Sequence, residues 1–228
     1  MVRPGSNRAG LAPIVLPAIG GGFVAEEIAS QISSLQSNVA DLQSRASLTD
    51  VQADVSQLDQ QLSKMAQTLE SVRKQGYVYG GDIDAKLYDL MSQWQSVKPQ
   101  VDNAIYQQGY ALSQSAAALH GPLSQLAARQ GNAGQARSLL PSVQSSVSSL
   151  LSNANQVENN IRTMYSNIES EASTLDSRLW RIDNTMKLVA GVKFKLANGE
   201  SAVMAVKAKW DKDGKDDPEG NLFLTDKR

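Results

Sequence analysis

The fold is decided by residues 140–189, LPSVQSSVSSLLSNANQVENNIRTMYSNIESEASTLDSRLWRIDNTMKLV. Apolar residues in this stretch recur at alternating steps of three and four positions, which places them on one narrow stripe of an α-helix. Such a stripe is buried only against other helices that carry a similar stripe. The stripe consists of Leu140, Val143, Val147, Leu150, Ala154, Val157, Ile161, Met164, Ile168, Ala172, Leu175, Leu179, Ile182, Met186 and Val189.

The spacing lapses once, with two consecutive steps of four around Ile168. Together with the preceding step of three they make an eleven-residue step, which relaxes a supercoil without breaking the helix. The stretch therefore predicts one helix of about fifty residues, roughly 75 Å long at 1.5 Å per residue. We expect this helix to begin near Pro141, because proline is tolerated in a first turn.

Two earlier segments carry the same pattern. The first resets by two residues, which predicts a break near Ser47, with the Ser47 side chain capping the helix that follows. The second contains Pro99, which predicts a kink. The first stripe is Ile28, Ile32, Leu35, Val39, Leu42, Ala46, Leu48, Val51, Val55, Leu58, Leu62, Met65, Leu69 and Val72; the second is Ile83, Leu87, Leu90, Trp94, Val97, Val101, Ile105, Leu112, Leu119, Leu123 and Leu126.

Two glycine-containing turns separate the three helical zones. One includes Gly76 and the pair Gly80-Gly81, with Asp82 as the expected N-cap, and the other covers residues 129–135. Folding the zones back on one another buries all three stripes. The sequence therefore predicts a mainly α protein, with a long antiparallel three-helix coiled-coil domain over 26–190, similar in outline to a spectrin-type repeat. A pair of long helical hairpins in a homodimer would satisfy the same pattern.

Residues 1–24 have a different composition, with three prolines and the run Gly20-Gly21-Gly22. This segment is expected to be a flexible arm. Its apolar part, Leu11 to Ile19, follows Arg3 and Arg8 as in a signal peptide, but prolines interrupt it. A segment that seeks a membrane surface is the other interpretation.

Composition limits the classes of function. The chain has 228 residues, a formal net charge of −1, no cysteine and one histidine. A net charge near zero argues against nucleic-acid binding. Without cysteine, disulfides, thiolate zinc sites and iron–sulfur clusters are excluded, and a cytoplasmic location, with or without membrane association, is favoured. No apolar run reaches the roughly eighteen residues that span a bilayer as a helix.

After Gly191 the pattern changes to the period of two that is typical of β-strands. Strands are expected at 192–196, 201–210 and 221–225, with a turn at Asn198-Gly199 and a charged loop, DKDGKDDPEG, over 211–220.

The end of the chain resembles the start of a bacterial pleckstrin-homology-like or GRAM-type domain. In that family a Gly-Glu near the first strands is followed by a GxLxLTxxR stretch, and Gly199-Glu200 and residues 220–228 (GNLFLTDKR) match this pattern. The resemblance covers about forty residues and implies a small β module for membrane or partner docking. Family members continue past this point with more strands and a closing helix, so we expect 191–228 to be a partial domain of a longer protein.

Four lysines form the candidate contact site. Lys193 and Lys195 share one strand face, and Lys207 and Lys209 share another, so paired strands would bring them together. The resemblance implies that such first-hairpin lysines hold lipid phosphates or a partner. Solvated strand edges would look the same in sequence.

Other polar and aromatic residues suggest no catalytic site. His120 is expected at a helix end, near the negative pole of the dipole. The acidic loop lacks the glutamate that a calcium loop needs at its twelfth position, which here is Leu222. Trp94 and Trp180 are expected to pack between helices. The aspartates of the loop are Asp211, Asp213, Asp216 and Asp217.

No Walker motif, dinucleotide fingerprint or nucleophile elbow occurs in the chain, so we expect no enzymatic activity and no cofactor. The sequence predicts a helical scaffold or protein-interaction protein that binds a partner, or itself, through its coiled coil. The alternative is an α-helical membrane-active protein, pore-forming or membrane-associating, that uses the apolar segment 11–24.

Overall fold

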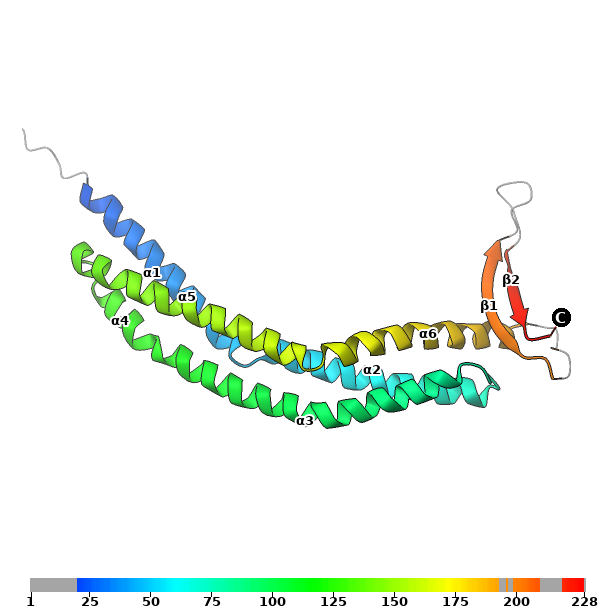
Figure 1. The fold of residues 1–228 in the computed structure, drawn as a ribbon. Helices are drawn as coiled ribbons and strands as arrows, with labels where there is room; N and C mark the ends of the chain where they lie inside the picture. The colour runs from blue at the N-terminus through cyan, green and yellow to red at the C-terminus, as the bar shows by residue number, and fades with distance from the viewer. Residues whose placement is uncertain (1–19, 193–195, 197–198, 210–218, 228) are drawn as a thin grey trace, which may run out of the picture.

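The computed structural model describes residues 20–192, 196, 199–209 and 219–227. Within these residues the chain forms six helices followed by two strands (Figure 1). The helices are α1 (Gly20–Arg45), α2 (Thr49–Lys74), α3 (Gly81–Ala118), α4 (His120–Ala128), α5 (Ala133–Thr163) and α6 (Ser166–Ala190), and the strands are β1 (Ala202–Lys209) and β2 (Glu219–Thr225).

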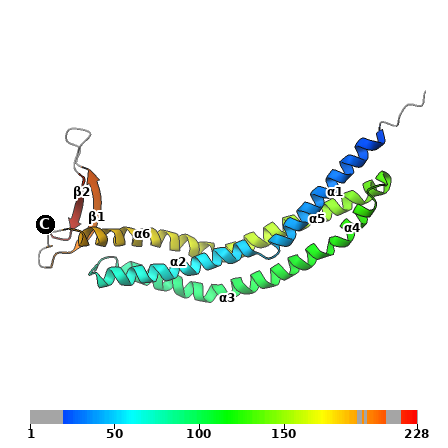
Figure 2. The same ribbon diagram turned by 180° about the vertical axis from the view of Figure 1, so that it is seen from behind.

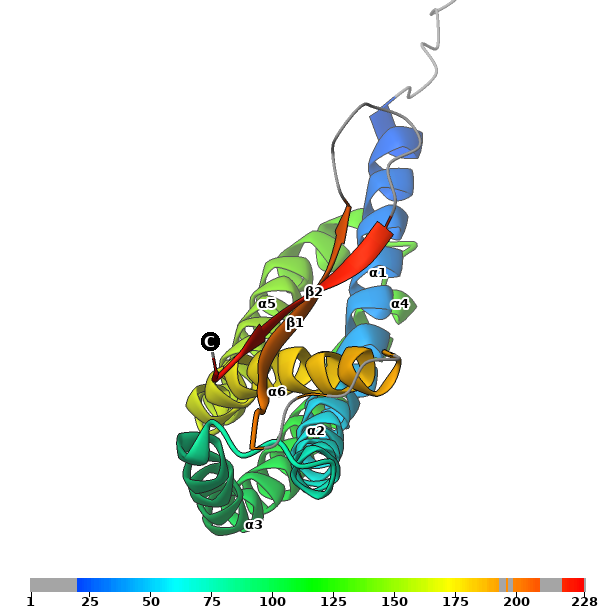
Figure 3. The same cartoon turned by 90° about the vertical axis from the view of Figure 1, so that its right-hand side faces the viewer.

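The helices form three antiparallel columns, which confirms the prediction of a mainly α protein with a small β segment. α1 and α2 make the first column, α3 and α4 the second, and α5 and α6 the third. α3 contacts both helices of each of the other columns. The result is a long bowed bundle with the hairpin of β1 and β2 at one end, seen from opposite sides in Figures 1 and 2. Viewed toward that end, the hairpin crosses α6 (Figure 3).

The core of the bundle is the meeting line of the three predicted stripes. Every residue of the first stripe is buried, and in the second stripe only Val97 is half-buried. In the third stripe most residues are buried, Leu150 and Val189 are half-buried, and Met164 is exposed. The three stripes thus cover one another within a single chain.

The first column breaks where the two-residue reset predicts. Leu48 takes a left-handed conformation, with φ of 51°, and its side chain is buried. Ser47 does not cap α2: its Oγ donates to the Ser44 carbonyl oxygen (2.7 Å), so the capping prediction was wrong. The burial of both Ala46 and Leu48 requires the chain to turn between them, and this turn points the Ser47 side chain back toward α1.

The third column also breaks, so the prediction of one continuous helix over 140–189 was wrong. α5 ends at Thr163 and α6 begins at Ser166. Tyr165, which was not assigned to the stripe, is 1% exposed, whereas Met164 is 38% exposed. The Tyr165 ring packs edge-to-face on Trp94, with centroids 6.1 Å apart. A large aromatic side chain therefore takes the stripe position at the point where the spacing lapses.

Two expected helix starts differ from the observed ones. α5 begins at Ala133, eight residues before Pro141, because the Asn132 side chain caps it by accepting from the Gln135 amide (3.2 Å). Asp82 is not the N-cap of α3. It lies in the first turn and accepts from the Arg178 side chain (2.9 Å) on α6.

Two other predictions for the helical region have mixed outcomes. Pro99 lies inside α3 without ending it. α1 begins at Gly20, within the arm predicted for 1–24, and residues 1–19 lie outside the described residues.

Ion pairs also join the columns. Arg45 of α1 pairs with Glu158 of α5 (2.9 Å), and Arg162 of α5 pairs with Asp54 of α2 (3.0 Å). Lys98 of α3 pairs with Asp59 of α2. These pairs are partly exposed, and each contributes on the order of 1 kcal/mol or less.

β1 and β2 confirm the strands predicted over 201–210 and 221–225. They are antiparallel, with Ala205 opposite Phe223 and Lys207 opposite Asn221. The expected strand at 192–196 and most of the charged loop lie outside the described residues.

Candidate interaction surface

The hairpin is attached to the bundle through a threonine in α6. Thr185 is 3% exposed; its Oγ1 donates to the Arg181 carbonyl oxygen (2.9 Å) and accepts from the Ala205 amide (3.2 Å). Ala202 and Ala205 are both buried, and their short side chains let β1 lie close against α6. The amide of Ala205 therefore points away from β2 and toward the helix.

A second attachment joins the hairpin to the loop between α2 and α3. The Asp226 carboxylate accepts from the Ser201 amide (2.7 Å) and from the Tyr79 hydroxyl (2.5 Å). The Ser201 amide and then the Tyr79 hydroxyl stabilise the charged carboxylate and lower the pKa of Asp226. The same bond to Asp226 raises the pKa of Tyr79.

The loop that supplies Tyr79 is organised by Arg73. The Arg73 guanidinium donates to the carbonyl oxygens of Tyr77 and Tyr79 (2.7 Å each) and of Gly80 (3.2 Å), and it pairs with Asp84. One side chain thus satisfies three carbonyl groups of a short loop, and this positions the tyrosine that holds the hairpin.

One face of the hairpin is an exposed apolar surface. Met204 lies opposite Leu224, and Val206 lies opposite Leu222. These four side chains are 47%, 59%, 42% and 65% exposed, respectively. Because side chains alternate along a strand, they share one face, and the buried Ala205 belongs to the other. We name this set of four residues the hairpin face.

Two further apolar side chains are exposed in the elements next to the hairpin. Val78, in the loop before α3, and Trp180, on α6, are each 66% exposed. The prediction that Trp180 packs between helices was wrong: Leu179 takes the stripe position, and the next residue points about 100° away around the helix. Trp94 does pack between helices, at 4% exposure, and its indole donates to Asp59 (2.5 Å).

The predicted lysine site is only partly described. Lys207 and Lys209 are exposed on β1, where Lys209 lies opposite Glu219. Lys193 and Lys195 lie outside the described residues, so the grouping of all four lysines stays a prediction.

His120 takes no part in a charged cluster. It is the first residue of α4 and directly follows Leu119, the C-cap of α3, so it lies near the negative pole of α3 as predicted. Its Nε2 lies 2.7 Å from the Gln43 Nε2 of α1. The aspartates of the loop over 211–217 lie outside the described residues. In the described part of the chain, no three acidic or histidine side chains are placed to hold a metal ion.

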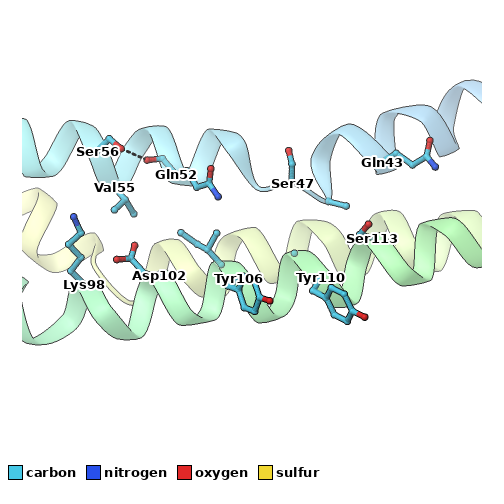
Figure 4. A pocket seen from close by; sticks show the side chains of 13 residues that line it. Gln43, Ser47, Gln52, Val55, Ser56, Lys98, Asp102, Tyr106, Tyr110 and Ser113 are labelled. Carbon is cyan, nitrogen blue, oxygen red and sulfur yellow. Dashed lines mark hydrogen bonds between the residues drawn. The ribbon is translucent and has the colours of Figure 1, made fainter.

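A groove of about 720 Å³ lies between α3 and the break of the first column. Its walls combine amide and hydroxyl side chains with apolar ones such as Val55 and Ile105, and Tyr106 and Tyr110 line it from α3 (Figure 4). Both tyrosines are exposed, at 76% and 63%. The groove follows from the turn at Leu48, which separates α1 from α2.

Sequence reasoning missed the residues that attach the hairpin. Thr185 lies three residues after Ile182 and directly before Met186, both of which belong to the stripe. This position on the apolar face of the helix could have indicated that its hydroxyl is buried. The bond between Tyr79 and Asp226 joins residues 147 positions apart and has no local signal. Among the helices that the structure describes, none combines the length and apolar character required to cross a membrane.

No protein-family model matches this chain, and comparisons with curated proteins and with solved structures give no significant match. The resemblance of residues 199–228 to a pleckstrin-homology-like module therefore stays a prediction.

Proposed function

We propose that this protein is a non-enzymatic helical scaffold that docks a partner protein at its hairpin end. The observation that carries the proposal is the gathering of exposed apolar side chains in the hairpin and the elements beside it: Val78, Trp180, Met204, Val206, Leu222 and Leu224. In the described bundle, most residues of the apolar stripes are buried where the three columns pack together. A surface patch of this kind is typical of an interaction site.

The energetics favour this use of the hairpin face. Fully burying a Leu, Val or Met side chain contributes about 1.5–3 kcal/mol, and these side chains are already about half covered. Covering the four of them would contribute on the order of 1 kcal/mol each. The two attachments of the hairpin, at Thr185 and at Asp226, hold the face in place before a partner arrives, which lowers the entropy cost of binding.

A membrane surface is the second candidate partner, and the exposed indole of Trp180 and the cations Lys207 and Lys209 favour it. Indole and lysine side chains are both common at the boundary between lipid and water. The resemblance to a pleckstrin-homology-like module supports the same candidate. The membrane-active alternative that uses residues 11–24 depends on a segment outside the described residues.

The test of the proposed function compares the full chain with a variant that carries Met204→Ser, Val206→Ser, Leu222→Ser and Leu224→Ser. Proteins that bind the wild type are identified by quantitative mass spectrometry after mild cross-linking. We expect the variant to lose specific partners while its helical circular dichroism is unchanged. Tyr88→Ser and Tyr106→Ser, at exposed tyrosines of α3, form the matched control and should keep those partners. Identical partner sets for the wild type and the hairpin-face variant would refute the proposal.

Vesicle flotation separates the two candidate partners. Binding to vesicles of phosphatidylcholine and phosphatidylserine that is lost when residues 1–24 are deleted would favour the alternative based on the N-terminal segment. Binding that survives this deletion but disappears when Lys193, Lys195, Lys207 and Lys209 are changed to Gln would make the hairpin end a lipid-binding element. We expect neither, because the proposed partner is a protein.

A further inference from the structure

A groove beside the hairpin face shares Met204 and Val206 with it and adds charged residues of α6 and β1. The groove, which we name the α6–β1 groove, has a volume of about 610 Å³ and runs between α6 and β1. Tyr77 and Ile182, both 8% exposed, line it together with Trp180 and with Val203–Lys207. This volume accommodates a few large side chains and is in the range of ordinary ligand clefts, about 300–1,000 Å³.

The groove combines apolar walls with positive charge. Arg181 and Lys207 both line it, and no acidic side chain is among the described residues around it. Neither cation forms an ion pair within the part of the chain that the structure describes. Asp183, two residues beyond Arg181, is already paired with Lys187 (2.6 Å).

Two hydrogen bonds attach the floor of the groove to the bundle. Thr185 fastens Ala205 to α6 at its centre, and the Tyr79–Asp226 bond holds the base of the hairpin. The cleft therefore does not depend on closure around a ligand, and two cations and an exposed indole are held beside it in advance. Pre-organised recesses with an aromatic anchor and an arginine are typical of the energetic centres of protein interfaces.

From this we infer that the α6–β1 groove binds a segment of a partner protein in which an apolar side chain is flanked by Asp or Glu. The inference rests on the proposed function, because it names the chemistry of the partner docked at that end. The apolar side chain lies against Trp180, and the carboxylates pair with Arg181 and Lys207. Charge complementarity of this kind selects the partner and its orientation.

Other occupants match the groove less well. Residues 1–19 of this chain contain Arg3 and Arg8 and no acidic residue, so their charge repels the two cations. Residues 211–219 of a second copy are acidic but contain no apolar anchor. A bilayer is contacted by protruding side chains, whereas the groove recedes between a helix and a strand.

The test is a selection from a phage-displayed library of random peptides against the immobilised full chain. We expect enriched peptides to contain Asp or Glu beside an aromatic or aliphatic residue. Synthetic copies should bind the wild type in calorimetry and bind the Arg181→Glu, Lys207→Glu double variant about ten-fold or more weakly. Trp180→Ala should weaken the same peptides, and raising the salt concentration should weaken them further.

Matched controls keep this result interpretable. Arg137→Glu, at an exposed arginine of α5, and Tyr106→Ala should leave peptide affinity unchanged. Circular dichroism verifies that each variant is folded. Failure to enrich any peptide, enrichment without acidic residues, or equal binding to the double variant would each overturn the inference.

Two further outcomes separate this inference from the proposed function. If no peptide is enriched but the hairpin-face variant still loses its partners, the proposed function stands and the assignment of the groove falls. If vesicles of phosphatidylcholine and phosphatidylserine capture the wild type but not the double variant, and the peptides do not compete, the groove takes lipid and the inference is wrong.

Discussion

At Gly109 the absence of a side chain lets α3 lie against the break between α1 and α2. A Cβ atom at this position would lie 2.9 Å from the Ala46 carbonyl oxygen and 3.7 Å from Leu48 Cδ1. Glycine inside a helix costs about 1 kcal/mol relative to alanine. The close approach to a backbone atom is the physical reason that the cost is tolerated here.

Gly109→Ala is therefore expected to destabilise the protein by about 1–3 kcal/mol, because backbone must move to admit the methyl group. Gly81→Ala, at the first residue of α3, is the matched control, since a Cβ there meets nothing within 4 Å. The control should be about 0.4–1 kcal/mol more stable than the wild type, because alanine lowers the conformational entropy of the unfolded chain. Urea unfolding followed by circular dichroism measures both. A gain for Gly109→Ala equal to that of the control would contradict the packing described.

The ionisation of Asp59 should make the stability of the fold depend on pH. Burial acts to raise the pKa of Asp59, but hydrogen bonds from Lys98 and Trp94 and the charge of Lys98 outweigh it, so the pKa is lowered. A carboxyl group whose pKa is lower in the folded state stabilises the fold above its unfolded pKa, about 3.9. That contribution is lost as the pH falls through the lowered folded pKa.

Asp59→Asn should accordingly destabilise the bundle at neutral pH. Its difference from the wild type should shrink once the pH falls below about 3.9. Denaturant titrations at a series of pH values measure this difference. Asp176→Asn, at an α6 residue with no ion pair among the described residues, is the control for the loss of one carboxylate. A difference in stability that is independent of pH would show that the charge of Asp59 does not stabilise the fold.

At the scale of the element, the helices follow the heptad pattern closely, but this pattern predicted only one of the two breaks between stacked helices, the one near Ser47. The stripes predicted most of the buried residues of the first two columns, and the period of two after Gly191 predicted the two strands of the hairpin. The break at 164–165 could not be predicted, because it depends on Tyr165 finding Trp94 on another helix. A spacing lapse that a continuous helix would tolerate is here the place where the helix ends.

The candidate site was less predictable than the fold. Lys207 and Lys209 could be placed on a strand from alternation alone. The attachments through Thr185 and Asp226 depend on where the hairpin lies against α6, whereas the exposure of Trp180 follows from its position next to the stripe residue Leu179. Contacts between segments that are distant in the chain form only in the assembled bundle, so local sequence patterns do not predict them.

Ile161 and Met164 make a sharp test of the third stripe, since the sequence assigns both to it and the structure buries only Ile161. Ile161→Asp should cost several kcal/mol, because it places an unpaired carboxylate in the core. Met164→Asp should cost about 1 kcal/mol or less at a solvated position. Thermal unfolding compares the two. Equal costs would mean that the break at 164–165 is absent.

At the scale of the whole molecule, the core cluster consists of residues of the helical region, so we expect the bundle to fold without the hairpin. Cutting the chain after Ala190 removes two buried alanines and the bonds to Thr185 and Tyr79, but none of the three stripes. The truncated protein should keep its helical circular dichroism and melt within a few degrees of the full chain. The full chain melted under the same conditions is the reference, and loss of the helical signal would show that the hairpin is part of the core.

The bow of the bundle coincides with irregularities in all three columns: the turn at Leu48, Pro99 inside α3, and the break before α6 (Figure 1). A curved rod under tension straightens before its helices stretch, because bending requires less force than axial extension. If the protein is pulled between its two ends, these three positions yield first.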